Sequence, residues 1–178
     1  METFCPAKPF VDHPEYEIKR AEALSSLDLD LIDKPIVDIV ESCSRLPHCF
    51  TLQSCYGHFV HPGQPDTRYT DPLADCPPGA QIEYRIAYLA LCLQNSSPGH
   101  KLFDDLQAVS LVDPQYIQFG SAHWFWRQNV NTYALQVEPE RFKNQDTAMV
   151  DLDEALHLES VRNAVFADLR QILTKPTG

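Results

Sequence analysis

The stretch Gln81-Ile-Glu-Tyr-Arg-Ile-Ala-Tyr-Leu-Ala-Leu-Cys-Leu93 decides the fold of this chain. At its start, the apolar residues at every second position from Ile82 to Tyr88 alternate with the polar Glu83 and Arg85. This period of two is typical of a strand that buries one face. From Tyr88 to Leu93 both faces are apolar, as in a central strand that is covered on both sides. The stretch therefore predicts a strand in the middle of a buried sheet.

Helical and extended patterns alternate on both sides of this strand. Apolar spacing and helix-start residues predict helices over 14–27, 34–45, 97–109 and 151–172. Alternation predicts strands over 50–56, 116–120 and 132–137, with Trp124–Trp126 extending the second or beginning the third. The order ααβ-loop-βαββα predicts an α+β fold in which helices pack against a mixed β-sheet. We expect residues 1–178 to form a single compact domain, with the Pro-rich stretch 62–80 as a long loop, either a mobile segment or a lid.

Composition excludes several classes of protein. The 178 residues hold 14 Lys and Arg against 25 Asp and Glu, a net charge of −11. The basic residues are scattered, which disfavours nucleic-acid and anionic-membrane partners. The six glycines are too far apart for a phosphate-binding loop or a dinucleotide-binding fingerprint. Nucleic acid and membranes are therefore disfavoured as partners, and we expect a small-molecule ligand because of the two candidate sites described below.

The N-terminus and the cysteines bear on the compartment. Met1–Pro6 carries no basic patch before an apolar stretch, and no apolar run is long enough to span a membrane. Without a visible secretory signal, the six cysteines are expected to be reduced thiols. We therefore expect a cytoplasmic protein.

The first candidate site is Gln53-Ser54-Cys55-Tyr56-Gly57-His58, which places a hydroxyl, a thiol and an imidazole at a strand break. These residues can form the wall of a substrate or cofactor pocket if Gly57 kinks the chain, with Cys55 and His58 as catalytic groups. The alternative is a strand end in which Cys55 packs as a small hydrophobe and His58 is solvated. A zinc site that also used Cys49 is strained, because six extended residues place it about 20 Å from Cys55. No metal site is therefore expected.

The second candidate site is His123-Trp124-Phe125-Trp126-Arg127. In a strand, Trp124 and Trp126 share one face and can stack an adenine ring, while Arg127 can hold an anionic group. The alternative is that one face belongs to the core and Arg127 reaches solvent. The two candidate sites together predict one pocket. We expect one wall to contain Ser54, Cys55, Gly57 and His58, and the opposite wall to contain Trp124, Trp126 and Arg127.

The stretch from Tyr16 to Phe59 resembles the wybutosine-synthesising protein 3 family. The family's hallmark is a strand reading Ser-x-x-Ser-Cys-Ser-Gly-Arg or similar after two helices, and Ser54-Cys55-Tyr56-Gly57-His58 occupies that place. In this chain Tyr56 stands for the second serine of that sequence and His58 for the arginine.

The resemblance implies an S-adenosylmethionine-dependent methyltransferase that acts on a tricyclic guanosine in tRNA. It also implies that Ser54, Cys55 and Gly57 line the pocket. Methyl transfer requires alignment and, where the acceptor carries a proton, a base, for which His58 is the candidate. A non-catalytic ligand-binding or interaction protein of the same fold, without tRNA activity, remains the alternative.

Overall fold

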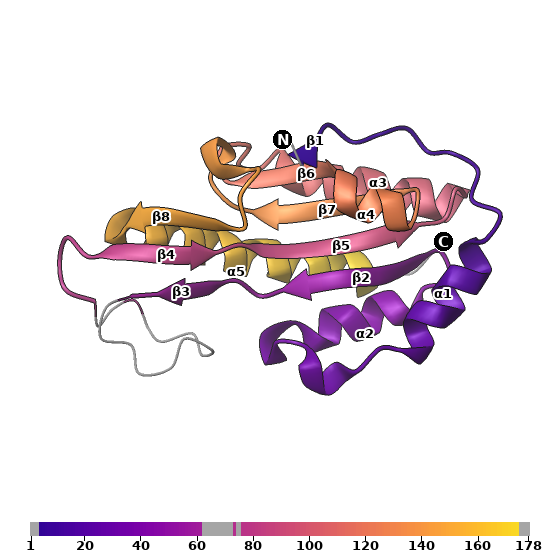
Figure 1. Cartoon of the computed structure of the whole chain (residues 1–178), viewed down its shortest axis with the longest axis horizontal. Helices are drawn as coiled ribbons and strands as arrows, with labels where there is room; N and C mark the ends of the chain where they lie inside the picture. The colour runs from indigo at the N-terminus through magenta and orange to yellow at the C-terminus, as the bar shows by residue number, and fades with distance from the viewer. Residues whose placement is uncertain (1–3, 62–72, 74–75, 175–178) are drawn as a thin grey trace.

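Two antiparallel sheets form the framework of the structure, a computed structural model that describes residues 4–61, 73 and 76–174 (Figure 1). The larger sheet contains, in spatial order, β1 (Phe4–Cys5), β6 (Ile117–Ala122), β7 (Thr132–Val137), β5 (Ala87–Leu93) and β2 (Cys49–Cys55). The smaller sheet contains β3 (His58–Val60), β4 (Gln81–Arg85) and β8 (Thr147–Asp151). The strand predicted from the 81–93 stretch thus divides into β4 and β5, and β5 lies between β7 and β2 as predicted for a buried strand.

The two sheets meet end to end. In Figure 1, β3 continues the direction of β2 and β5 continues that of β4. The pairing of the two long strands crosses both breaks, with Cys55 opposite Tyr88 and His58 opposite Arg85. The breaks therefore lie side by side and form one junction between the sheets.

The buried Tyr84 fixes the junction from inside the core. Its hydroxyl donates to the carbonyl oxygen of Val137 at 2.8 Å and accepts from the backbone N–H of Ala87 at 3.0 Å. Burial raises the pKa of Tyr84, so this donor keeps its proton. A hydrogen bond at each side ties β4 to the start of β5 and to β7.

Five α-helices flank the sheets in the described part of the chain: α1 (Tyr16–Ser25), α2 (Val37–Arg45), α3 (Ser97–Ser110), α4 (His123–Gln128) and α5 (Leu152–Thr174). Short 3₁₀ turns cover Leu29–Leu31, Lys34–Ile36 and Glu140–Phe142. The long α5 runs behind both sheets in Figure 1 and contacts β4, β7 and β8. One continuous cluster of buried apolar side chains joins α2, α3 and α5 to both sheets.

The α+β class and the four predicted helices are confirmed. The expectation of a mixed sheet is wrong, because every strand pairing among the described residues is antiparallel. A strand over Trp124–Trp126 is also wrong, because these residues belong to α4. The predicted loop 62–80 lies mostly outside the described residues. None of the described helices has the length and apolar character needed to cross a bilayer.

Candidate functional site

The break between β2 and β3 depends on Gly57. Its φ of +89° is in the left-handed region, which residues with a side chain adopt at a cost. A Cβ there would lie 2.8 Å from the Cβ of Ala87 and 3.0 Å from its backbone nitrogen. Both the left-handed backbone conformation and the close approach of Ala87 therefore favour glycine at this position.

A buried arginine holds the same break from α5. Arg162 is 2% exposed, and its Nη1 donates to the carbonyl oxygen of Gly57 at 3.0 Å. Its guanidinium lies over the rings of Tyr56 and Phe59, 4.0 and 5.3 Å from their centroids. Its Nη2 also lies 3.5 Å from the Glu159 Oε1, so the buried charge is compensated by a carboxylate, a carbonyl oxygen and aromatic faces.

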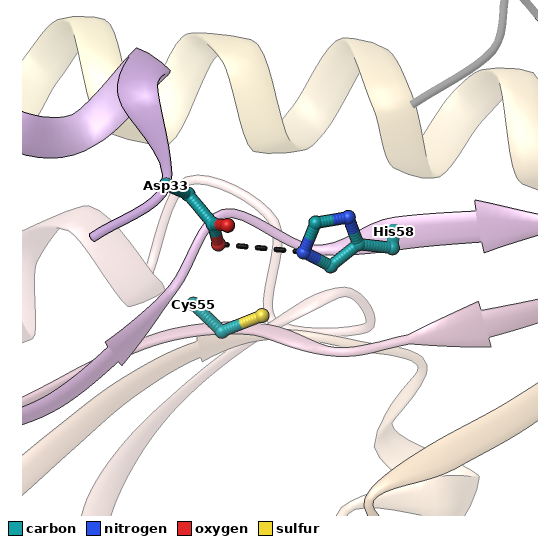
Figure 2. A group of neighbouring side chains, drawn as sticks. All are labelled: Asp33, Cys55 and His58. Atoms are coloured by element: carbon teal, nitrogen blue, oxygen red, sulfur yellow. Dashed lines mark ion pairs between the residues drawn. The ribbon is translucent and has the colours of Figure 1, made fainter. Parts of the chain in front are cut away.

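The break brings Cys55 and His58 to the same place, together with Asp33. In a regular strand, residues three positions apart point to opposite faces. Here the His58 Nε2 lies 3.4 Å from the Asp33 Oδ2, and Figure 2 shows the Cys55 sulfur turned toward the same ring nitrogen. One ligand atom from each of the three side chains lies within 4.8 Å of the others. We call Asp33, Cys55 and His58 the Asp–Cys–His cluster.

The backbone of the break orients the cluster. The N–H of Tyr56 donates to the Asp33 Oδ2 at 2.7 Å, and the N–H of Gly57 approaches the Cys55 Sγ at 3.4 Å. Asp33 directly precedes the helix predicted over 34–45, yet its side chain makes no capping hydrogen bond to the 3₁₀ turn that follows. Its carboxylate instead accepts from the N–H of Tyr56 and pairs with His58, both of which belong to the break.

The cluster carries charge at neutral pH. The carboxylate of Asp33, and after it Cys55, raises the pKa of His58 to about 9. The hydrogen bond from His58 in turn lowers the pKa of Asp33, against the opposing effect of burial. His58 is therefore an imidazolium at pH 7, and it holds its proton more tightly than an ordinary imidazolium does. The predicted role of general base requires the neutral ring, which predominates only above about pH 9.

A cavity of about 590 Å³ opens beside Cys55 at the junction. We call it the Cys55 cavity. Its aromatic lining comes from Phe4, Tyr88, Trp124 and Phe125, and its polar lining includes Arg85, Gln136 and Asp146. Burial raises the pKa of Tyr88 to about 12, so its hydroxyl is neutral. Trp124 is 69% exposed and forms an outer part of the wall. The volume falls within the range of small-molecule sites.

A buried carboxyl lies next to this cavity. The Glu138 side chain is inaccessible to solvent and accepts a short hydrogen bond from Gln136, which lines the cavity. Its other oxygen, Oε2, has no hydrogen-bond partner within the described parts of the chain. Burial raises the pKa of Glu138 to about 8, so the carboxyl is protonated at neutral pH.

The structure brings together part of the predicted site. Cys55 and His58 meet in the cluster, and Trp124 lines the same cavity as Cys55. Gly57 contributes through its backbone conformation. Ser54 is on the opposite side of β2, because neighbours in a strand alternate, and it lines a groove of about 880 Å³ beside α1.

Trp126 and Arg127 are outside the lining of the Cys55 cavity, which corrects their predicted place opposite Cys55. Because α4 is a helix, Trp124 and Trp126 do not share a face. Trp126 packs edge-to-face on Tyr133 with the Lys8 ammonium 5.0 Å from its ring centroid, and Arg127 is exposed. The alternative interpretation therefore holds here: Trp126 packs against the core, and Arg127 reaches solvent.

Sequence reasoning missed Asp33, Arg85 and Asp146 as site residues. Glu83 and Arg85 are the polar residues on one face of the predicted strand, and they form an ion pair at 3.0 Å. Arg85 in addition lines the cavity. Asp146 reaches the junction because its carbonyl oxygen accepts from the N–H of Ile86 at 3.3 Å. The contact between Asp146 and Ile86 joins segments distant in sequence, and no local pattern predicts it.

No protein-family model and no curated protein matches the sequence. Among solved structures, the chain is similar to the PH1069 protein from Pyrococcus horikoshii, with a TM-score of 0.50 and 14% identity over 90% of this chain and 93% of that one. A hypothetical protein from Aeropyrum pernix gives a TM-score of 0.45 and 10% identity, with 79% of this chain and 97% of that chain covered. The first likeness supports the fold.

Proposed function

We propose that this chain is an S-adenosylmethionine-dependent methyltransferase whose cofactor site is the Cys55 cavity. The observation that carries the proposal is that Cys55, a residue of the sequence that resembles the wybutosine-synthesising hallmark, lines an aromatic cavity of about 590 Å³. The resemblance supplies the activity, and the cavity supplies a place of the right size beside the residues that carry it.

The lining fits the chemical parts of this cofactor. Aromatic rings of Trp124 and Phe125 offer faces on which an adenine can stack. The Asp146 carboxylate can accept hydrogen bonds from ribose hydroxyls, and the Arg85 guanidinium can pair with the carboxylate of an amino acid. The ring of Tyr88 suits a nearby cation, since aromatic faces attract positive charge.

The chain's own residues would hold and orient the reactants. S-adenosylmethionine, when bound, supplies an electrophilic methyl group on a sulfonium. His58 is outside the cavity lining, which corrects its predicted place on the pocket wall, and its ion pair with Asp33 would instead position the residues beside Cys55. The acceptor that the resemblance implies is the tricyclic guanosine of tRNA. Alignment of the reactants is the main contribution of a protein to this reaction.

Titration calorimetry with S-adenosylmethionine and S-adenosylhomocysteine, in the presence of a chelator, tests the proposal. Trp124→Ala removes a stacking surface of about 1–3 kcal/mol and should weaken binding about fivefold or more. Arg127→Ala is the matched control, because Arg127 is exposed on the same helix but outside the cavity lining. Absence of heat with either ligand, from folded protein, would overturn the proposal, as would equal effects of the two variants.

A ligand-binding protein without methyl transfer is the second candidate. The observation that favours it is His58 itself, which stands where the resembled sequence has an arginine and is paired with Asp33. Incubation with S-adenosylmethionine and a tRNA that carries the tricyclic guanosine, followed by mass spectrometry of the nucleosides, separates the two. Methylated guanosine supports the enzyme. Binding without any methylated product supports the second candidate.

A further inference from the structure

We propose that the Asp–Cys–His cluster is a binding site for one divalent transition-metal ion of the zinc type. The inference is independent of the proposed cofactor, because it concerns three side chains that converge in the absence of any ligand. This cluster is the one group of three His, Cys, Asp or Glu side chains within the described residues whose ligand atoms come this close.

The spacing of the ligand atoms fits a metal. With metal–ligand bonds of 2.0–2.3 Å and tetrahedral angles, the ligand atoms of a zinc site lie about 3.3–3.8 Å from one another. The His58 Nε2 and the Asp33 Oδ2 are already 3.4 Å apart, and all three ligand atoms lie within 4.8 Å. Only a small movement of the Cys55 sulfur is needed to complete three corners of a tetrahedron.

The donor types and their charges select the ion. Thiolate and imidazole prefer zinc and its neighbours in the first transition row, whereas magnesium and calcium prefer sites made of oxygen alone. One carboxylate and one thiolate balance the two positive charges of the ion, and binding releases the Nε2 proton of His58 and the thiol proton of Cys55 to solvent. Figure 2 shows the second ring nitrogen of His58 turned away from Asp33 and Cys55, which leaves Nε2 as the coordinating atom.

The surroundings hold the ligands in place before a metal arrives. The N–H of Tyr56 fixes the Asp33 carboxylate and the N–H of Gly57 points at the Cys55 sulfur, as second-shell donors do in metal sites. Both N–H groups belong to the break that Gly57 and Arg162 maintain.

The site has an open side. Its residues are only partly buried, with the side chains of His58 and Asp33 18% and 31% exposed. Because Cys55 also lines the Cys55 cavity, the fourth position of the ion would be accessible to a ligand from that cavity. Three protein ligands and one open position are the arrangement of catalytic zinc sites, and structural sites use four.

Cobalt(II) and zinc(II) titrations of tag-free, chelator-treated protein test this inference without any cofactor. We expect one Co²⁺ per chain, with a thiolate-to-cobalt charge-transfer absorption in the near ultraviolet that Zn²⁺ displaces. Cys55→Ser should abolish the absorption and weaken Zn²⁺ binding more than about 100-fold, and Asp33→Asn should weaken it at least about 10-fold.

Cys5→Ser is the matched control. Cys5 is also a partly exposed free thiol, but its Sγ lies 3.2 Å from the carbonyl oxygen of Ser121 at the other edge of the larger sheet. Its loss should leave the absorption and the affinity unchanged. Thermal unfolding of each metal-free variant checks that it is folded. An absorption that survives in Cys55→Ser, or absence of binding at millimolar Co²⁺, would overturn the inference.

These results are separate from those of the proposed function. Metal binding is measured without S-adenosylmethionine, and the cofactor titration contains a chelator. Either inference can therefore fail while the other stands.

Discussion

Replacement of Gly57 by alanine tests how the junction between the sheets is built. A residue with a side chain pays roughly 1–2 kcal/mol to adopt a left-handed φ such as the +89° of Gly57. The new Cβ would also lie 2.8 Å from the Ala87 Cβ and 3.0 Å from the Ala87 nitrogen, so β5 must shift. Such overpacking typically costs about 1–3 kcal/mol. We expect Gly57→Ala to lower the free energy of unfolding by about 2–5 kcal/mol.

Gly79→Ala is a control that separates the cost of the left-handed backbone conformation from the cost of a steric clash. Gly79 has a φ of +79°, but a Cβ there would meet no atom within 4 Å. Its replacement should therefore cost only the conformational part, about 1–2 kcal/mol. Urea unfolding followed by tryptophan fluorescence measures both variants against the wild type. Equal losses would refute the close approach of Gly57 to Ala87.

A second substitution refines the test. Ala87→Gly, added to Gly57→Ala, removes the carbon at 2.8 Å but leaves the backbone nitrogen at 3.0 Å. The double variant should therefore regain part of the stability that the clash removes, and none of the stability that the left-handed φ removes. A double variant as unstable as the sum of the two single variants would show that the two residues do not touch.

Three further predictions concern charged groups of the same region. Because burial raises the pKa of Glu138 from 4.5 to about 8, the folded state binds a proton more tightly, and stability falls as pH rises between these values. Glu138→Gln should remove about 3 kcal/mol of the loss between pH 5 and pH 8, measured by urea unfolding at each pH, and an unchanged slope would contradict it. Asp33→Asn should return the His58 pKa from about 9 toward 6.5, seen in an NMR titration of the ring protons, since Asp33 is the main cause of the shift. Arg162→Met should destabilise the fold by about 1–3 kcal/mol, because the Gly57 carbonyl loses its buried donor, and a calorimetric melting temperature equal to that of the wild type would contradict it.

The sequence predicted the main elements because their patterns are long or have clear ends. The strand over Thr132–Val137 and the closing helix carry strong periodicity, and the side chain of Asp151 accepts from the N–H of Glu154 as an N-terminal cap should. The pairing and register of the strands could not be predicted from the sequence. Antiparallel pairing of β5 with both β2 and β7 depends on where the chain returns, which no local period encodes.

The helix α4 shows a different limit. His123-Trp-Phe-Trp126 is rich in aromatic residues, which favour strands and have modest helix propensity. Tertiary contacts override that preference in a helix of only six residues, since Trp126 packs against Tyr133 and under Lys8. The predicted alternation failed there, and with it the predicted places of Trp126 and Arg127.

The candidate site was predictable only in part for the same reason. Cys55 and His58 lie within two residues of Gly57, whose role as a kink could be anticipated from the alternation. Asp33 reaches them from 22 residues before Cys55, and its carboxylate is positioned by the N–H of Tyr56. Only the folded chain reveals that contact.

The central claim is that the Cys55 cavity binds a ligand, and the reactivity of Cys55 tests it most directly. Alkylation of Cys55 by iodoacetamide is followed by mass spectrometry with and without millimolar S-adenosylhomocysteine, with Cys5 as the internal reference thiol. The account predicts that the ligand slows modification of Cys55 and leaves that of Cys5 unchanged. Equal rates for Cys55 with and without the ligand would contradict it.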